Sequence, residues 1–176
     1  AADWGGPAGI AFIATTPRTR WLPVWPGDEF APGGVNVALA LAAAVALQER
    51  EEQRAQTDAH LRHLIGTIRA AVASIEGVDV VGDPDERLPH VLTFSCLYAD
   101  GEALVSELDR AGFAIGSGSA CTSGTLEPSR VLAAVGALTH GNVRLSLPPS
   151  VTEADVEAFL AALTPALERI RARLGA

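Results

Sequence analysis

The feature that most constrains this fold is a stretch of helical composition running from residue 36 to about residue 75. Helices in globular proteins average about 11–12 residues, so this stretch is far longer than a mean helix. It opens on the apolar run Val37–Leu47, which is too short to span a bilayer. We therefore expect a helix that links two parts of the molecule, with a bend or break between residues 53 and 57.

The residues after this helix alternate between strand and helix patterns. We expect strands at 78–81, 90–96, 113–115 and 142–147, and helices over 101–110, from 127–128 onward, and after a capping box at 152–155. Several connections are too short for parallel crossovers. The sequence thus predicts an α+β fold with a mixed or antiparallel sheet and helices on one face. The final helix should bury one stripe, made of Val156, Phe159, Leu160, Leu163, Leu167, Ile170 and Leu174.

The residues before the long helix have a different character. Two short strands are expected at 9–14 and 20–24, and a loop rich in Pro and Gly at 25–34. We interpret residues 1–35 as the end of one domain, 36–76 as a linking helical region and 77–176 as a second domain.

Composition narrows the class of protein. The net charge of −8 argues against a nucleic-acid surface, which needs a basic face. Two cysteines without metal-ligand spacing favour a reduced, cytoplasmic protein with no metal site. Since the longest apolar run is too short to span a bilayer, no membrane segment is expected. The chain has no Met, so we expect Ala1 to be an internal residue of a longer protein. The chain also has no lysine, and the thirteen residues counted together as Lys and Arg are all arginine.

A loop of small residues, 116–124, contains Cys121. Such a loop contributes little to a core and leaves the thiol within reach of solvent, as a nucleophile requires. The alternative is a plain flexible loop that contains a cysteine by chance, and the residues alone leave both open. Cys96 differs, because it lies in an alternating strand between Phe94 and Leu97 and is predicted to be a buried structural thiol.

Arg144 lies between apolar residues on the strand expected at 142–147. It can be a surface residue on an alternating strand, or a two-pronged donor directed at a carboxylate in a cleft. His60 and His63 are three residues apart on the long helix and fit a solvated helix face better than a metal site, since no acidic or cysteine partner is spaced to complete one.

Together these residues resemble the cysteine desulfurases of the class V aminotransferase, fold-type I family of enzymes that use pyridoxal phosphate. Residues 116–135 are similar to the family's active-site loop with S-G-S-A-C-T-S followed by L-E-P-S, and residues 142–147 to its S-x-R-x-S-L strand. Residues 4–9 resemble the aromatic-G-G-P-x-G segment that follows the cofactor lysine. The resemblance covers nearly the whole chain and implies the end of the large domain, a long linking helix and the C-terminal small domain.

The resemblance implies specific roles. Cys121 corresponds to the residue that takes sulfur from L-cysteine as a persulfide, and Arg144 to the residue that holds the substrate carboxylate. The loop that carries sulfur to an acceptor protein comprises, besides Cys121, the residues Gly116, Ser117, Gly118, Ser119, Ala120, Thr122 and Ser123. A homodimer is also implied.

The sequence departs from the family pattern at the cofactor site. Ala2 and Asp3 stand where the family has a His-Lys pair, and the segment 25–37 has no Ser, Thr or basic residue. Gly33 and Gly34 are what remains of the phosphate-binding segment. Pyridoxal phosphate is therefore expected in the intact family enzyme but not covalently on this chain, which alone should be inactive.

Three hypotheses follow. The chain is the C-terminal part of a cysteine desulfurase-like enzyme, or a lysine-less homologue that carries sulfur without catalysis, or a dimerisation module with an inert loop.

Overall fold

The computed structural model describes residues 1–20, 34–117 and 129–175. They form two compact units, residues 1–56 and 57–176. The elements in chain order are η1 (Ala2–Trp4), α1 (Val37–Ala73), β1 (Val78–Val81), β2 (Val91–Cys96), α2 (Gly101–Arg110), β3 (Gly116–Ser117), α3 (Arg130–Ala134), β4 (Asn142–Ser146) and α4 (Glu153–Leu174). The predicted long helix is thus confirmed.

Helix α1 contributes to both units, because the division falls between residues 56 and 57. Every residue from Val37 to Ala73 is helical, so the expected break near residues 53–57 does not interrupt it. Within the described part of the chain, no helix combines the length and apolarity that crossing a bilayer requires.

In unit 1, the N-terminal segment packs against the first half of α1. The indole Nε1 of Trp4 donates to the carbonyl of Ala43 at 3.1 Å. A Cβ on Gly6 would lie 3.3 Å from the Cα of Ala43, so the small residue permits this close approach. The prediction of a strand at 9–14 is wrong, because these residues do not pair with another strand among the described residues. The strand expected at 20–24 falls almost entirely outside the described residues.

Unit 2 contains an antiparallel sheet with strand order β1-β2-β4-β3. This confirms the α+β expectation and the strands at 78–81, 90–96 and 142–147. The strand expected at 113–115 forms instead at Gly116–Ser117, where the chain pairs with β4. Phe113 and Ile115 pack against the core as partly buried side chains.

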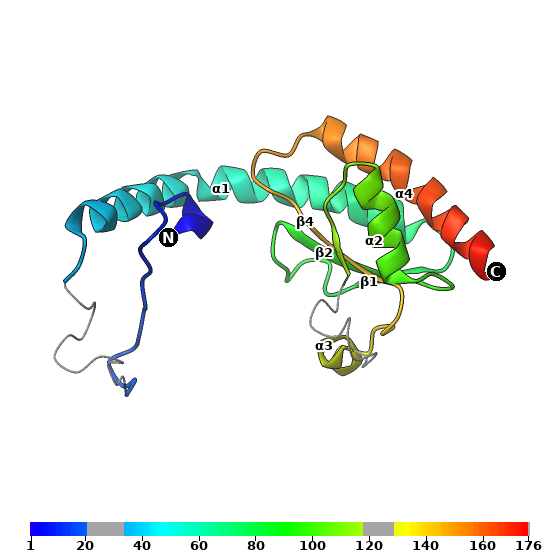
Figure 1. Cartoon of the computed structure of the whole chain (residues 1–176), viewed down its shortest axis with the longest axis horizontal. Helices are drawn as coiled ribbons and strands as arrows, with labels where there is room; N and C mark the ends of the chain where they lie inside the picture. Colours follow the sequence, from blue (N-terminus) through cyan, green and yellow to red (C-terminus); the bar gives the residue numbers. More distant parts are fainter. Residues whose placement is uncertain (21–33, 118–128, 176) are drawn as a thin grey trace. The chain divides into compact units, whose positions relative to one another are not determined.

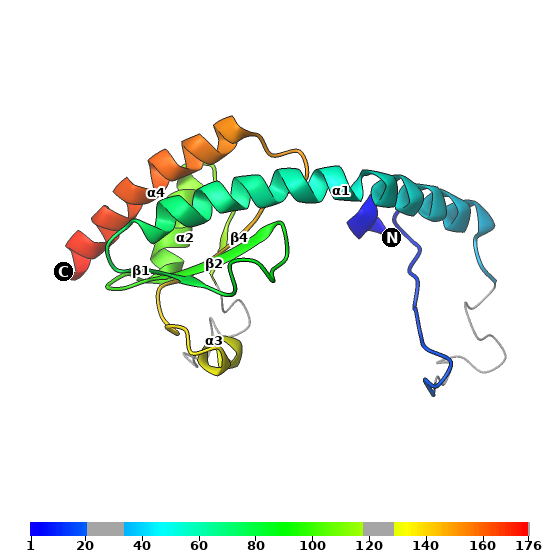
Figure 2. The same ribbon diagram turned by 180° about the vertical axis from the view of Figure 1, so that it is seen from behind.

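Alternation along the central strands gives the sheet two different faces. In β2, Leu92, Phe94 and Cys96 are buried on one face, and Val143 and Leu145 of β4 join them. Figures 1 and 2 show α2, α4 and the second half of α1 on this side of the sheet, and α3 on the other. The apolar face is therefore the core of unit 2, and we call the opposite face the open face.

Helix α4 begins and packs as its sequence predicts. Thr152 accepts from the Asp155 amide while Asp155 accepts from the Thr152 amide, which completes a capping box. The predicted stripe is buried except for Leu160, which is half-buried, and Leu174, whose side chain lies outside the described part. Helix α3 begins at Arg130 behind the cap residue Ser129, two residues later than expected.

Candidate functional site

Arg144 lies near the middle of the sheet and points away from the core. Its neighbours Val143 and Leu145 are buried, whereas Arg144 is exposed on the open face. Since β4 has a partner strand on each side, Arg144 is paired with Thr93 of β2 and with Gly116 of β3. The main chain that carries this guanidinium is thus fixed on both edges.

The start of the predicted sulfur-carrying loop lies beside Arg144. Gly116 pairs directly with Arg144, and a Cβ on Gly116 would lie 4.0 Å from Nη2 of that arginine. Ser117 pairs with Val143 and leads into residue 118. The structure therefore brings together Arg144 and the first two residues of the loop. The other predicted loop residues lie outside the described part, namely Gly118, Ser119, Ala120, Cys121, Thr122 and Ser123.

Cys96 is confirmed as a buried thiol. It is 2% exposed, and burial raises the pKa of its thiol to about 11, although the charge of Arg171 opposes the shift. A thiol with a raised pKa is a poor nucleophile at neutral pH, because the thiolate is the reactive form. The burial and the raised pKa of Cys96 thus both favour a structural thiol over a reactive one.

The two glycines assigned to the cofactor segment are only partly described. Gly33 lies outside the described residues, and Gly34 stands exposed just before α1 with φ of 90°. Gly34 belongs to unit 1, whereas Arg144 belongs to unit 2.

His60 and His63 lie on an exposed face of α1, as predicted from the sequence. His60 is exposed, with Nε2 2.9 Å from the carbonyl of Val151, and His63 is exposed beside Glu153 at 3.5 Å. Among the described residues, no cluster of three or more potential ligands could hold a metal ion.

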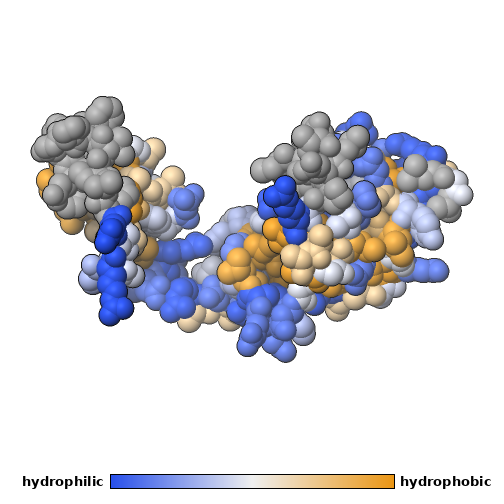
Figure 3. All heavy atoms as spheres, turned by 90° about the horizontal axis from the view of Figure 1, so that it is seen from below, coloured by the Kyte–Doolittle hydropathy of each residue, from blue (hydrophilic) through white to orange (hydrophobic). Residues whose placement is uncertain are grey.

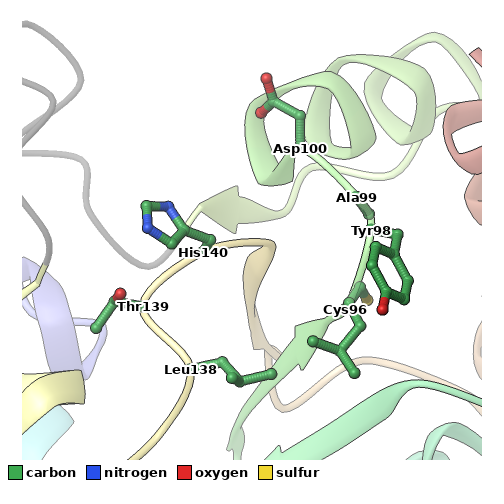
Figure 4. A pocket seen from close by; sticks show the side chains of 8 residues that line it. Cys96, Tyr98, Ala99, Asp100, Leu138, Thr139 and His140 are labelled. Carbon is green, nitrogen blue, oxygen red and sulfur yellow. The ribbon is translucent and has the colours of Figure 1, made fainter. Parts of the chain in front are cut away.

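A pocket that the sequence did not reveal lies where β2 leads into α2. It measures about 500 Å³ and is lined by residues 96–100 and 138–140 (Figure 4). The walls come close together because Gly141 is small: with φ of 67°, a Cβ there would lie 2.1 Å from the Cys96 carbonyl oxygen. The positive φ of 56° at Tyr98 turns the opposite wall. The sequence signal was His140-Gly141, a glycine immediately before a strand.

Sequence reasoning also missed a buried polar pair near Arg144. Ser95 is 0% exposed and Asn142 is 7% exposed, and they are the two buried polar residues among those described. The Ser95 hydroxyl donates to Oδ1 of Asn142 at 2.7 Å. Both residues alternate with core residues on their strands, and this alternation was the available signal.

Comparison with known proteins identifies the family. The aminotransferase class-V profile matches residues 26–159, which is most of the chain. The chain belongs to this family. It is 34% identical to the cysteine desulfurase NifS of Azotobacter vinelandii over 94% of the chain and 43% of that protein. It is 33% identical to a mitochondrial cysteine desulfurase of Eremothecium gossypii over 94% of the chain and 35% of that protein.

The fold agrees with this assignment. A NifS-like protein from Rickettsia africae superposes with a TM-score of 0.71 over 85% of this chain and 41% of that structure, at 19% identity. The chain thus spans less than half the length of these relatives.

The residues of this chain do not fit covalent attachment of the family's cofactor. Pyridoxal phosphate is held through a lysine, and the sequence contains none. Residue Asp3, where the resemblance places that lysine, lies in η1 with a carboxylate side chain. What the described residues do offer is an exposed arginine, Arg144, paired with Gly116 at the start of the predicted loop.

Proposed function

We propose that this chain is the part of a cysteine desulfurase that binds the carboxylate of L-cysteine and receives its sulfur. The observation that carries the proposal is the pairing of Gly116 with Arg144, which starts the Cys121 loop beside an exposed guanidinium. The similarity to proteins named cysteine desulfurase supports the same substrate and reaction.

Each residue has a defined task. Arg144 offers two parallel N–H donors to a carboxylate, which fixes both the position and the orientation of an amino acid. The thiol of Cys121 bonds to the sulfur of L-cysteine, the carbon–sulfur bond breaks, and a proton takes the place of sulfur on carbon. The products are alanine and a persulfide on Cys121, so atoms and electrons balance.

Release of sulfur in this family depends on pyridoxal phosphate, and none of these 176 residues is a lysine that could bind it covalently. We propose that the intact protein acts in a reduced, cytoplasmic compartment as a homodimer and passes the persulfide sulfur to an acceptor protein.

The test is persulfide formation on the intact protein after incubation with L-cysteine, located by mass spectrometry of peptides. Cys121 should gain one sulfur atom, and Cys121→Ser should abolish both the gain and the release of sulfide. Cys96→Ser is the matched control and should leave both unchanged, because the Cys96 thiol is buried with a raised pKa. Failure to form any persulfide from L-cysteine would refute the proposal.

A second function is favoured by one observation, the absence of lysine. A protein that cannot release sulfur itself can still accept it, so the chain would carry sulfur supplied by a separate desulfurase. Incubating the chain with such an enzyme and L-cysteine distinguishes the two functions. Sulfur on Cys121 only when the second enzyme is present would establish a carrier and exclude autonomous desulfuration.

A further inference from the structure

A buried polar pair, Ser95 and Asn142, lies where β4 begins. Ser95 and Asn142 face each other across the β2–β4 ladder, and the next pair on the same face, two residues along, is Thr93 and Arg144. The hydroxyl of Ser95 lies 2.7 Å from Oδ1 of Asn142 and 3.3 Å from the carbonyl of Leu138. One buried serine therefore connects β2, β4 and the segment that leads into β4.

Polar pairs of this kind are not needed for stability. Apolar residues of the same shape can replace a buried hydrogen-bonded pair at little cost, whereas removing one partner leaves the other unsatisfied. What a buried polar pair adds is specificity, because only one alignment of the two strands satisfies both groups. Here it favours the register in which Ser95 is opposite Asn142.

Register decides where Arg144 points. Side chains alternate between faces, so a shift of β4 by one residue would turn Arg144 into the core and Val143 out of it. The main chain around the pair is packed so closely that small shifts are also resisted. A Cβ on Gly101 would lie 2.7 Å from the carbonyl oxygen of Asn142, and the Cys96 amide donates to the Gly141 carbonyl at 2.9 Å.

We propose that Ser95 and Asn142 are positioning residues that hold Arg144 in place for carboxylate binding. The inference rests on the proposed function, because it assumes that Arg144 binds the carboxylate of L-cysteine. Neither residue touches the substrate; both act through the alignment of β4. Small errors in such an alignment weaken a two-pronged interaction strongly, since both hydrogen bonds require the same geometry.

The test compares two ligands that differ in one group. L-Cysteine and cysteamine share a thiol and an amine, but cysteamine lacks the carboxylate. The ratio of their dissociation constants, measured by titration calorimetry on the intact protein, gives the carboxylate preference. Arg144→Ala should reduce this preference by about tenfold or more, the loss expected for charge-assisted hydrogen bonds. Ser95→Ala and Asn142→Ala should each reduce it by about threefold to tenfold.

Two further variants separate positioning from folding. Val72→Ala removes a fully buried side chain from α1 on the core side of the sheet, so it should lower the unfolding temperature and keep the preference. The exchange Ser95→Asn with Asn142→Ser keeps the total volume and the hydrogen bond, and should restore most of the preference that either alanine variant loses. In the Arg144→Ala background, Ser95→Ala should have no additional effect, because the residue that it positions is gone.

The outcomes distinguish the two proposals. If the Arg144→Ala variant keeps the preference for L-cysteine over cysteamine, Arg144 does not bind the carboxylate. The proposal that Ser95 and Asn142 position Arg144 for this purpose is then wrong as well. If Arg144→Ala loses the preference while Ser95→Ala and Asn142→Ala retain it, only the positioning role is overturned. An equal loss in Val72→Ala would also overturn it, because general destabilisation would then explain the effect.

Discussion

At the scale of single residues, the two cysteines have opposite environments in sequence and should have opposite chemistry. Cys96 is 2% exposed on the core face of β2, and burial raises its pKa to about 11. Its thiol should therefore react with iodoacetamide at pH 8 only after unfolding, whereas Cys121 reacts in the native protein. Peptide mapping after a short pulse of reagent measures both rates, and equal native rates would contradict the assignment of Cys121.

The same raised pKa predicts how stability changes in alkali. The folded state favours the neutral Cys96 thiol, so this contribution is complete below the ordinary thiol pKa of 9.0 and is lost as pH rises towards about 11. The unfolding free energy should fall between pH 9 and 11 more steeply in the native sequence than in Cys96→Ala. Urea titrations of both proteins at several pH values give this difference, and parallel pH curves would show that Cys96 does not ionise differently on unfolding.

The candidate site was only partly predictable at this scale. Arg144 could be singled out because a charged residue interrupts an apolar strand, and the structure places it on the open face. Its juxtaposition with Gly116 could not, since the pairing of β3 with β4 depends on a contact between residues far apart in sequence. The role of Cys121 stays a prediction, because that residue lies outside the described part.

At the scale of elements, the turn before β4 depends on a glycine for two separate reasons. Gly141 has φ of 67°, and an added Cβ would lie 2.1 Å from the Cys96 carbonyl oxygen. Gly136 has a similar φ of 71° but nothing within 4 Å of the same position. Gly136→Ala should cost about 1–2 kcal/mol from backbone strain alone, and Gly141→Ala more than about 3 kcal/mol. Equal losses in chemical denaturation would contradict the steric explanation.

The cap of α4 offers a milder test. Thr152→Ala removes one half of the capping box and should lower the unfolding free energy by about 1 kcal/mol. Hydrogen bonds from Thr152 hold the pKa of the Asp155 carboxyl below its ordinary value of 3.8. The contribution of that carboxylate is therefore present above about pH 4 and is lost as pH falls further. Denaturation curves at pH 7 and pH 3 should show a larger effect of the substitution at pH 7.

Elements with strong local signals were predicted well, and the two errors, at 9–14 and 113–115, concern segments of strand-like composition whose pairing the sequence does not show. The capping box and the stripe of α4 are local patterns, so both are confirmed. The expected strand at 9–14 has the apolar composition of a strand, but a strand also requires a partner. Pairing with β4 likewise placed β3 at 116–117 rather than at 113–115.

At the scale of the whole molecule, the two units differ in how many of their apolar side chains are buried. In unit 2, the core cluster draws its residues from α1, β2, α2, β4 and α4 and from the segments between them. The exposed apolar residues of α3 and the following segment include Val131 and Val135 at 72% and 62% (Figure 3 views this side of the molecule). In unit 1, Val37 and Leu41 are 75% and 65% exposed on α1. The buried residues among those that the structure describes are thus concentrated after residue 56.

This distribution predicts that residues 57–176 fold on their own. The fragment retains Leu61, Leu64, Ile65, Ile68 and Val72 of α1, which are the α1 members of the core cluster. It should show one cooperative unfolding transition by circular dichroism, at a denaturant midpoint close to that of the corresponding transition in the whole chain. Within the whole chain, Leu64→Ala should cost about 2–5 kcal/mol, because Leu64 is 1% exposed. Leu41→Ala is the matched control on the same helix and should change this transition by less than about 0.5 kcal/mol. A fragment that unfolds without cooperativity would show instead that the first half of α1 is needed to complete the core.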